Sequence, residues 1–334
     1  MSSRLGKRTV AFMKNISIKS AYSVVGPMEA DGPLHSFFDE LLEDDTLKEK
    51  SYEKAESAML RKVYDGLIKK CGIRQDEIDM FIGGDLLNQI IATTYAVRGY
   101  ESAYYGVYNA CSTFSLAIQI ASNYIESSSF NNIIVSASSH FSSAERQYRT
   151  PLELGCKNPP TAQRTVTGAG GLLLSSEASK VRIKNMTAGK VVDFGIKDPF
   201  DMSSAMAPAA TDTILTHFNA TKTSFKDYDI VLTGDLSEKG VSIVSDMLTD
   251  VGFPSSNLTD CGKLIYNRQK QNVGGGGSGA GCSTVVFCGY IYDLMLKEKL
   301  KKVLFVPTGA LLSPTSTLQK ESIPAIAHAV CFEV

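Results

Sequence analysis

The chain has 334 residues, of which 43% are hydrophobic and 21% charged, a composition typical of a globular protein with a large core. Its 34 basic residues nearly balance its 35 acidic ones, which argues against a polybasic binder of nucleic acid or of a membrane surface. The seven cysteines include no CxxC pair, so neither a disulfide framework nor a zinc site is expected. The apolar stretch Val10–Met13 ends at Lys14, and we expect neither a signal peptide nor a membrane-spanning segment.

Helices and strands are predicted to alternate in the first half of the chain. Residues 51–70 are predicted to form a helix, because apolar residues recur every four positions, Ser51 can cap the first turn and Gly72 can end the last. The segment DEIDMFIGGDL at residues 76–86 predicts a buried strand that ends in a glycine turn and presents Asp85 at its carboxyl end.

Cys111 stands at a predicted strand-to-helix junction, within YNACSTF. A thiol there lies near the positive end of the helix dipole, which lowers its pKa and favours the thiolate, and the backbone N–H groups can bind an anion. The following helix is expected to carry Leu116, Ile120, Tyr124 and Ile125 on one side and to lead into the strand NNIIVSAS. The alternative is a small buried cysteine that only packs.

Matching elements are predicted in the second half. A helix is expected over Ala207–Phe218, with Pro208 near its first turn, where a missing N–H group does no harm. The segment KDYDIVLTGDL at residues 226–236 resembles the earlier strand and presents Asp235 at the matching position. A helix over Ser237–Val251, a glycine-rich loop and the strand VLFVPTG are expected to follow.

These matches indicate an internal duplication. The two strand segments end in the same Gly-Asp-Leu sequence, and the tripeptide Cys-Ser-Thr opens a helical segment at Cys111 and again at Cys282. The alternation of strands and helices favours mainly parallel sheets covered by helices. The predicted halves are residues 1–180 and 181–334.

Two histidines and a glycine-rich run add candidate site residues. His140 follows the strand IIVSASS and His328 lies within AIAHAVCF, so either can face a site, although a hydrogen-bonded core histidine is the more common case. No HxxxH pair indicates a zinc site. The glycine-rich run at residues 272–282, which includes Gly276, can bring N–H groups close to a ligand or form a packing turn, but it lacks the Lys-Ser/Thr of a phosphate loop.

The duplicated halves, the cysteine at the start of the central helix of the first half and the late glycine-rich loop resemble the thiolase superfamily, which includes the ketoacyl synthases. The resemblance extends over essentially the whole chain. It implies an α/β fold, a five-layer αβαβα sandwich built from two duplicated halves, in which the cysteine is acylated by thioesters of coenzyme A or a carrier protein.

The sequence departs from that superfamily at the groups that assist the cysteine. In the ketoacyl synthase III branch, a histidine follows the strand that here reads DIVLT, and an asparagine follows a glycine in the next turn; Gly234-Asp235 and Gly262-Lys263 stand at these places. The late glycine-rich turn also lacks the histidine of thiolases. Because losing such donors costs on the order of 100-fold in rate each, we predict that Cys111 is a pocket residue and that no residue is catalytic.

A narrower resemblance is to the stage V sporulation protein AD family of endospore-forming bacteria, carried by GGDLLNQ, ACST, TVTGAG and TGDLSEKG. It implies a peripheral protein of the spore inner membrane that binds dipicolinic acid and aids its uptake into the developing spore with other proteins of the same transport complex. The superfamily further implies a homodimer formed through Ala103–Tyr108. No cofactor is expected.

Dipicolinate is a planar dianion, so its site needs N–H donors or cations and a flat apolar slot. The carboxylates of Asp85 and Asp235 would repel this dianion. Our hypothesis is that they act through a bridging Ca²⁺ ion or water, or that one of them is protonated. The alternative is that both aspartates only cap helices. An active acyltransferase that uses Cys111 with His140 or His328 as base is an alternative, and a scaffold with a vestigial pocket is another. The candidate ligand-binding residues are Asp85, Asn88, Cys111, His140, Thr167, Asp235, Gly276 and His328.

Overall fold

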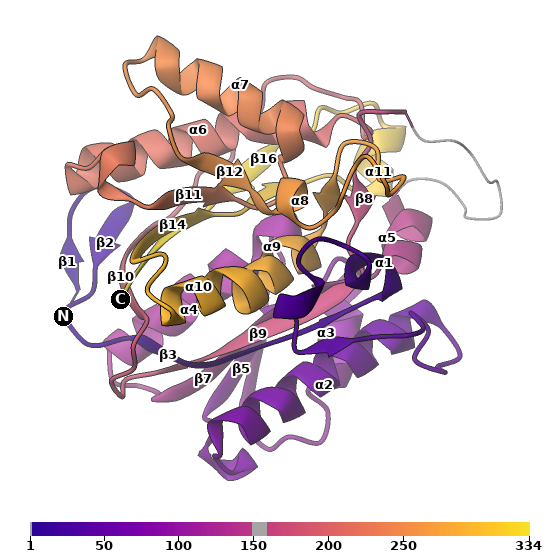
Figure 1. Cartoon of the computed structure of the whole chain (residues 1–334), viewed down its shortest axis with the longest axis vertical. Coiled ribbons are helices and arrows are strands. Elements are labelled where there is room, and N and C mark those ends of the chain that lie inside the picture. The colour runs from indigo at the N-terminus through magenta and orange to yellow at the C-terminus, as the bar shows by residue number, and fades with distance from the viewer. Residues whose placement is uncertain (1, 149–158) are drawn as a thin grey trace.

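The computed structural model describes residues 2–148 and 159–334; residue 1 and residues 149–158, which belong to the expected N-terminal half, lie outside the described residues. Helices α2 and α3 cover one outer face, α6 and α7 cover the other, and α4, α9 and α10 lie between two halves of a large sheet (Figure 1). The predicted five-layer sandwich is therefore confirmed. The helices span Tyr52–Cys71 (α2), Ile91–Ala96 (α3), Thr113–Glu126 (α4), Met202–Thr221 (α6), Ser237–Asp250 (α7), Ala280–Val286 (α9) and Tyr292–Leu296 (α10).

The two halves of the sheet repeat one strand order. The first runs β3-β9-β7-β5-β6 and the second β10-β17-β14-β11-β12. In each, the first two pairings are antiparallel and the last two are parallel, so the sheet is mixed, in contrast to the mainly parallel sheets expected. The strands span Ser17–Val25 (β3), Met80–Gly84 (β5), Ala103–Gly106 (β6), Asn132–Ser139 (β7), Gly168–Ser175 (β9), Arg182–Thr187 (β10), Ile230–Thr233 (β11), Leu258–Asp260 (β12), Lys302–Val306 (β14) and Ala329–Glu333 (β17).

The repeated aspartates at the start of the matching strands have the same structural role. Asp79, before β5, accepts hydrogen bonds from the N–H groups of Asn131 (2.7 Å) and Asn132 (2.9 Å) at the start of β7. Asp229, before β11, accepts from the N–H groups of residues 301 and 302 (2.6 and 2.8 Å) at the start of β14. Each carboxylate thus joins the beginnings of two neighbouring parallel strands.

The outer helices confirm one prediction and correct another. Helix α2 is capped by Ser51, whose side chain accepts from the N–H of Lys54 (3.3 Å), and it ends at Gly72 with φ = 71°, as the sequence predicted. Helix α6, however, begins at Met202, so Pro208 lies in its interior and not near its first turn. A proline there removes one backbone hydrogen bond. Since α6 is buried along most of its length, packing outweighs this loss.

Helix α4 lies between the two sheet halves and is buried on nearly all sides. The stripe formed by Leu116, Ile120 and Tyr124 is its less buried side, because the apolar residues on the other faces pack against both sheets. Its neighbour β6 is the last strand of the sheet, and Tyr105 of β6 is hydrogen-bonded through its hydroxyl to Tyr124 (3.0 Å).

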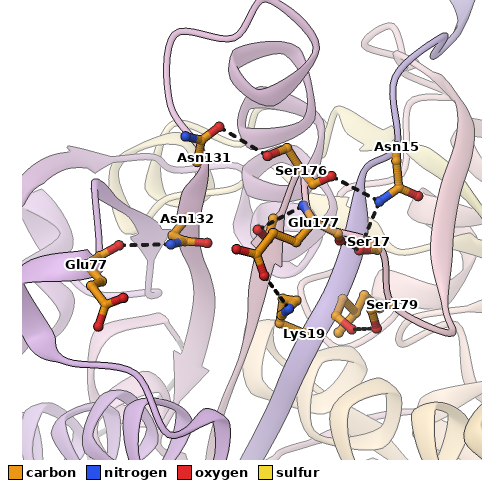
Figure 2. Close-up of polar contacts among 11 residues, drawn as sticks. Asn15, Ser17, Lys19, Glu77, Asn131, Asn132, Ser176, Glu177 and Ser179 are labelled. Carbon is orange, nitrogen blue, oxygen red and sulfur yellow. Dashed lines mark hydrogen bonds and ion pairs between the residues drawn. The ribbon is translucent and has the colours of Figure 1, made fainter.

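Polar contacts fix the connection between the two halves of the sheet, at residues 176–181 (Figure 2). The hydroxyl of Ser176 donates to the side-chain oxygen of Asn131 (3.1 Å), and Glu177 forms an ion pair with Lys19 of β3 (2.6 Å). The chain therefore enters the second half from a point held against the first. The predicted boundary between residues 180 and 181 falls in this connection and stays a prediction.

Candidate functional site

A narrow cavity of about 50 Å³ lies beside Cys111, and residues of both halves line it. At roughly 10–15 Å³ for each water molecule, it holds only a few waters. We name it the Cys111 pocket. Its apolar lining is Leu86, Ala110, Ala144, Pro199, Met202, Ala310 and Leu312, and its polar lining is Tyr108, Cys111, Glu145, Tyr148, Thr165, Ser278 and Gly279.

A short 3₁₀ turn, Ala110–Ser112, directs Cys111 into the pocket at the start of α4. Ala110 has φ = 48°, a left-handed conformation that costs about 1–3 kcal/mol for a residue with a Cβ atom. The turn is held by the side chain of Asn109, which donates to the hydroxyl of Ser112 (2.7 Å), and by the hydroxyl of Thr113, which donates to the Ala110 carbonyl (2.7 Å). A strained backbone held this firmly indicates that the position of Cys111 matters.

Three groups surround the Cys111 sulfur: the carboxyl of Asp235, the N–H of Gly279 and the hydroxyl of Ser278. Burial, followed by the charge of Asp235 and the hydrogen bond that the thiol donates to it, raises the pKa of Cys111 well above its ordinary value. The predicted lowering of the thiol pKa by the helix dipole is therefore wrong, because burial and the adjacent carboxyl outweigh the dipole. Cys111 is a neutral thiol at physiological pH.

Asp235 follows β11 and is fully buried. One carboxyl oxygen accepts from the hydroxyl of Thr308 (2.9 Å); the other accepts from the hydroxyl of Ser278 (3.2 Å) and the N–H of Gly279 (3.3 Å). Burial raises the pKa of Asp235 to about 7, although the thiol of Cys111 and the other donors oppose that rise. This carboxyl can therefore take up or release a proton near neutral pH.

Asp260, at the end of β12, holds the turn that carries Asp235. Its carboxylate accepts from the hydroxyl of Thr233 (2.7 Å) and from the N–H groups of Leu236 and Ser237 (both 2.8 Å). Sequence reasoning did not identify this residue. As the first residue of DCGKLIY it resembles many helix-capping aspartates, and its position gave no signal of its link to Asp235.

The glycine-rich run brings Ser278 and Gly279 to Cys111. Strand β13 (Gly277–Ser278) pairs with β8 (Arg164–Thr165), and Gly279 has φ = 98°. A Cβ atom on Gly279 would lie 2.7 Å from the hydroxyl of Ser139, so only glycine fits there. Gly276 supports the loop, because its carbonyl accepts from the N–H of Arg164 (2.8 Å), but it does not line the pocket.

Asp85 occupies the position in the first half that Asp235 occupies in the second, yet it does not line the Cys111 pocket. Its oxygens accept from the N–H of Leu87 (2.9 Å) and from the N–H and hydroxyl of Thr93 (both 2.7 Å). Asp85 therefore organises the loop that leads into α3. This role corresponds to the helix-capping alternative given for this residue from the sequence. Since these bonds occupy Asp85, the hypothesis of a Ca²⁺ ion bridging it to Asp235 has no geometric support.

Neither candidate histidine lines the Cys111 pocket. The His140 ring is bonded on both sides: Nε2 donates to the carbonyl of Asp45 (2.8 Å) and Nδ1 accepts from the N–H of Ser142 (3.2 Å), while burial lowers its pKa. His328 accepts from the N–H of Gly189 (3.0 Å), and burial lowers its pKa to about 4. Both are neutral, hydrogen-bonded core residues, and neither is placed to serve as a base for Cys111.

Asn88 and Thr167 also lie away from the pocket. The backbone N–H of Asn88 donates to the side chain of Gln147 (3.3 Å) on the surface. Thr167 accepts from the N–H of Phe141 (3.1 Å) and donates its own N–H to the buried Glu29 (3.1 Å). Of the eight candidates, Cys111 lines the pocket, Asp235 lies directly behind it and Gly276 supports its wall.

Solved structures of condensing enzymes share this fold. The chain is similar to 3-oxoacyl-[acyl-carrier-protein] synthase III of Aquifex aeolicus, at 12% identity over 96% of this chain and 100% of that one, with a TM-score of 0.58. A Xanthomonas campestris OleA variant bound to cerulenin matches with a TM-score of 0.62 and 12% identity over 97% of this chain and 98% of that one. The fold is therefore thiolase-like, with a cysteine-centred pocket between its two halves.

The family is equally clear. The profile of stage V sporulation protein AD matches residues 6–333, and the stage V sporulation protein AD of Bacillus subtilis is 43% identical over 98% of this chain and 97% of its own length. The chain belongs to the stage V sporulation protein AD family, and it is a sporulation protein.

Proposed function

We propose that this protein binds dipicolinic acid in the Cys111 pocket and does not catalyse acyl transfer. The groups that surround Cys111 are the observation that supports the proposed lack of acyl transfer. A condensing enzyme needs a nucleophilic thiolate and donors for an oxyanion. Here the buried thiol donates to a carboxyl group, and both candidate histidines are engaged elsewhere.

The lining of the pocket supports an aromatic acid as ligand. Tyr108 and Tyr148, whose hydroxyls are 3.2 Å apart, form an aromatic wall, and apolar side chains complete a narrow slot. Ser278 and Gly279 present a hydroxyl and an N–H group to a carboxylate. An aromatic ligand whose ring is larger than the present cavity fits only if side chains such as Met202 and Leu312 change rotamer. Such rotamer changes are common on binding.

The proposed role is uptake of dipicolinic acid into the developing spore, together with other proteins of the same transport complex. In the residues that the structure describes, no helix is long and apolar enough to cross a membrane. We propose a peripheral position at the spore inner membrane, reached through protein partners, because the chain has a net charge of only −1. We propose that Ca²⁺ reaches the pocket chelated by the ligand.

We also propose that the protein forms a homodimer through β6. Within residues 2–148 and 159–334, strand β6 pairs only with β5, which leaves its other edge open, and Tyr105 on it is 44% exposed. The less buried stripe of α4 continues this apolar surface. An open edge strand next to an apolar stripe suits pairing with a second copy.

Calorimetric titration with pyridine-2,6-dicarboxylate, with and without Ca²⁺, tests the binding. We expect saturable binding to the wild type, a loss of roughly tenfold in affinity for Ser278→Ala, which removes one hydroxyl donor, and no change for Ser245→Ala on the outer helix α7. Mass spectrometry after incubation with acyl thioesters is the complementary measurement. Acylation of Cys111 without dipicolinate binding would favour the acyltransferase, and neither signal would favour a scaffold.

A further inference from the structure

Three of the donors that line the Cys111 pocket already serve Asp235. Cys111, Ser278 and Gly279 line the cavity, and the thiol, the hydroxyl and the N–H group of these residues donate to Asp235 behind it. Thr308 is a further side-chain donor to Asp235, and it does not line the pocket. Asp235 therefore occupies three donors with which an incoming carboxylate at this wall would have to bind.

A ligand carboxylate that captures these donors would change the surroundings of Asp235 in two ways. It would weaken the hydrogen bonds that favour the ionised form of Asp235, and it would place a second negative charge next to it. Both changes favour the protonated carboxyl, as in sites where two carboxylates share one proton.

A cation beside Asp235 would relieve this repulsion. Among the residues described, no lysine or arginine lines the pocket. The titratable groups that line the pocket are Tyr108, Cys111, Glu145 and Tyr148, and Asp260, Cys261 and Cys282 lie close to Asp235. None of these described groups is cationic. Among the described residues, a proton on Asp235 is the neutralising charge at hand.

We propose that Asp235 takes up one proton from solvent when a carboxylate ligand binds in the Cys111 pocket, so that ligand and proton bind together. The proton then lies on the Asp235 carboxyl, which donates it within the cluster, while the ligand accepts from Ser278 and Gly279. This proposal rests on the proposed function, because it needs a carboxylate to reach the pocket. It makes Asp235 the residue that sets the pH dependence of binding.

The sign of the pH dependence follows. Since the free carboxyl has a pKa of about 7, Asp235 is protonated in acid and binding is then insensitive to pH. Above that value the proton must be acquired on binding, so the affinity falls about tenfold for each pH unit. A carboxylate ligand is itself ionised throughout this range and contributes no proton.

The test is calorimetry with pyridine-2,6-dicarboxylate between about pH 6 and pH 9, in buffers of different ionisation enthalpy, which counts the protons exchanged. We expect uptake of about one proton per ligand at pH 8.5 in the wild type and none in Asp235→Asn, whose side chain has the same shape but cannot titrate. Glu56→Gln is the control. Glu56 is another buried carboxyl, whose pKa is raised to about 8 by burial, but it lies outside the pocket, so this variant should keep the uptake.

The outcomes are distinct. Wild-type binding with an affinity that stays flat above neutral pH, and without proton uptake, overturns the proposal for Asp235 and leaves the binding function standing. Equal uptake by the wild type and by a folded Asp235→Asn protein also overturns it. No binding by the wild type at any pH overturns the binding function and this proposal with it. If Asp235→Asn does not fold, Thr308→Val removes a donor to the ionised Asp235 carboxyl and should raise the pH above which the affinity falls; an unchanged pH profile overturns the proposal.

Discussion

Asp85 and Asp235 have the same place in the duplicated sequence and different roles in the structure. Asp85 is saturated by donors from its own loop. In the second half, Asp260 holds the corresponding turn, which leaves Asp235 to contact Cys111 and the glycine-rich loop. One aspartate thus organises a loop, while its duplicate belongs to the pocket.

The state of Cys111 gives a prediction at this scale. Because burial and Asp235 keep it a neutral thiol, Cys111 should react with iodoacetamide at least tenfold more slowly than Cys71, which is only partly buried. Peptide mapping by mass spectrometry after timed alkylation at about pH 8 measures both rates in one sample. Faster modification of Cys111 than of Cys71 would show that it is an activated nucleophile and would favour the acyltransferase.

At the scale of elements, the packing of α2 on the first sheet half buries a second carboxyl. Glu56 of α2 is almost fully buried and accepts from the hydroxyls of Ser138 (2.8 Å) and Ser143 (3.2 Å). Burial, followed by the charge of Asp85, raises the pKa of Glu56 to about 8. The interface between α2, β7 and α5 is therefore most stable with this carboxyl protonated.

This predicts a pH-dependent stability. The pKa of Glu56 is higher in the folded protein than its value of about 4.3 in the unfolded chain. The contribution of Glu56 to the free energy of unfolding is therefore fully present below about pH 4.3 and is lost as the pH rises toward about 8. Glu56→Gln should remove most of this fall and, at about pH 8.5, be more stable than the wild type by on the order of 1–3 kcal/mol. Denaturant unfolding at about pH 5 and pH 8.5 measures it, and equal pH profiles for both proteins would contradict the assignment.

At the scale of the whole molecule, the open edge of β6 predicts the oligomeric state. Tyr105→Lys places a charge on the proposed dimer surface and should shift the protein from dimer to monomer in sedimentation velocity at micromolar concentration. Leu318→Lys on α11 (Pro314–Leu318) is the matched control, because Leu318 is 84% exposed and far along the chain from β6. A wild-type monomer, or a Tyr105→Lys protein that stays dimeric, would contradict the proposal.

Much of the architecture could be predicted from local sequence. The capping of α2 by Ser51, its end at Gly72 and the repeated strand segments depend on neighbouring residues and on side-chain periodicity. The start of α6 could not be predicted, because Pro208 signals a first turn and only burial against the second sheet half keeps it inside the helix. Likewise, the apolar stripe of Leu116, Ile120 and Tyr124 on α4 predicted the buried side of that helix. Only the five-layer arrangement showed that the other sides of α4 are buried more deeply than this stripe.

The sequence by itself determined the duplication, the place of Cys111 at the start of the central helix and the absence of a histidine after β11, because these depend on residue type and spacing. The thiolase-like fold was implied by resemblance to a known superfamily. Only the tertiary structure decided which polar groups meet. It separated His140, His328 and Asp85 from the pocket, and it joined Cys111 to Asp235, Ser278 and Gly279. The physical reason is that protonation depends on burial and on neighbours far apart in the chain, so a helix start that predicts a thiolate instead holds a neutral thiol.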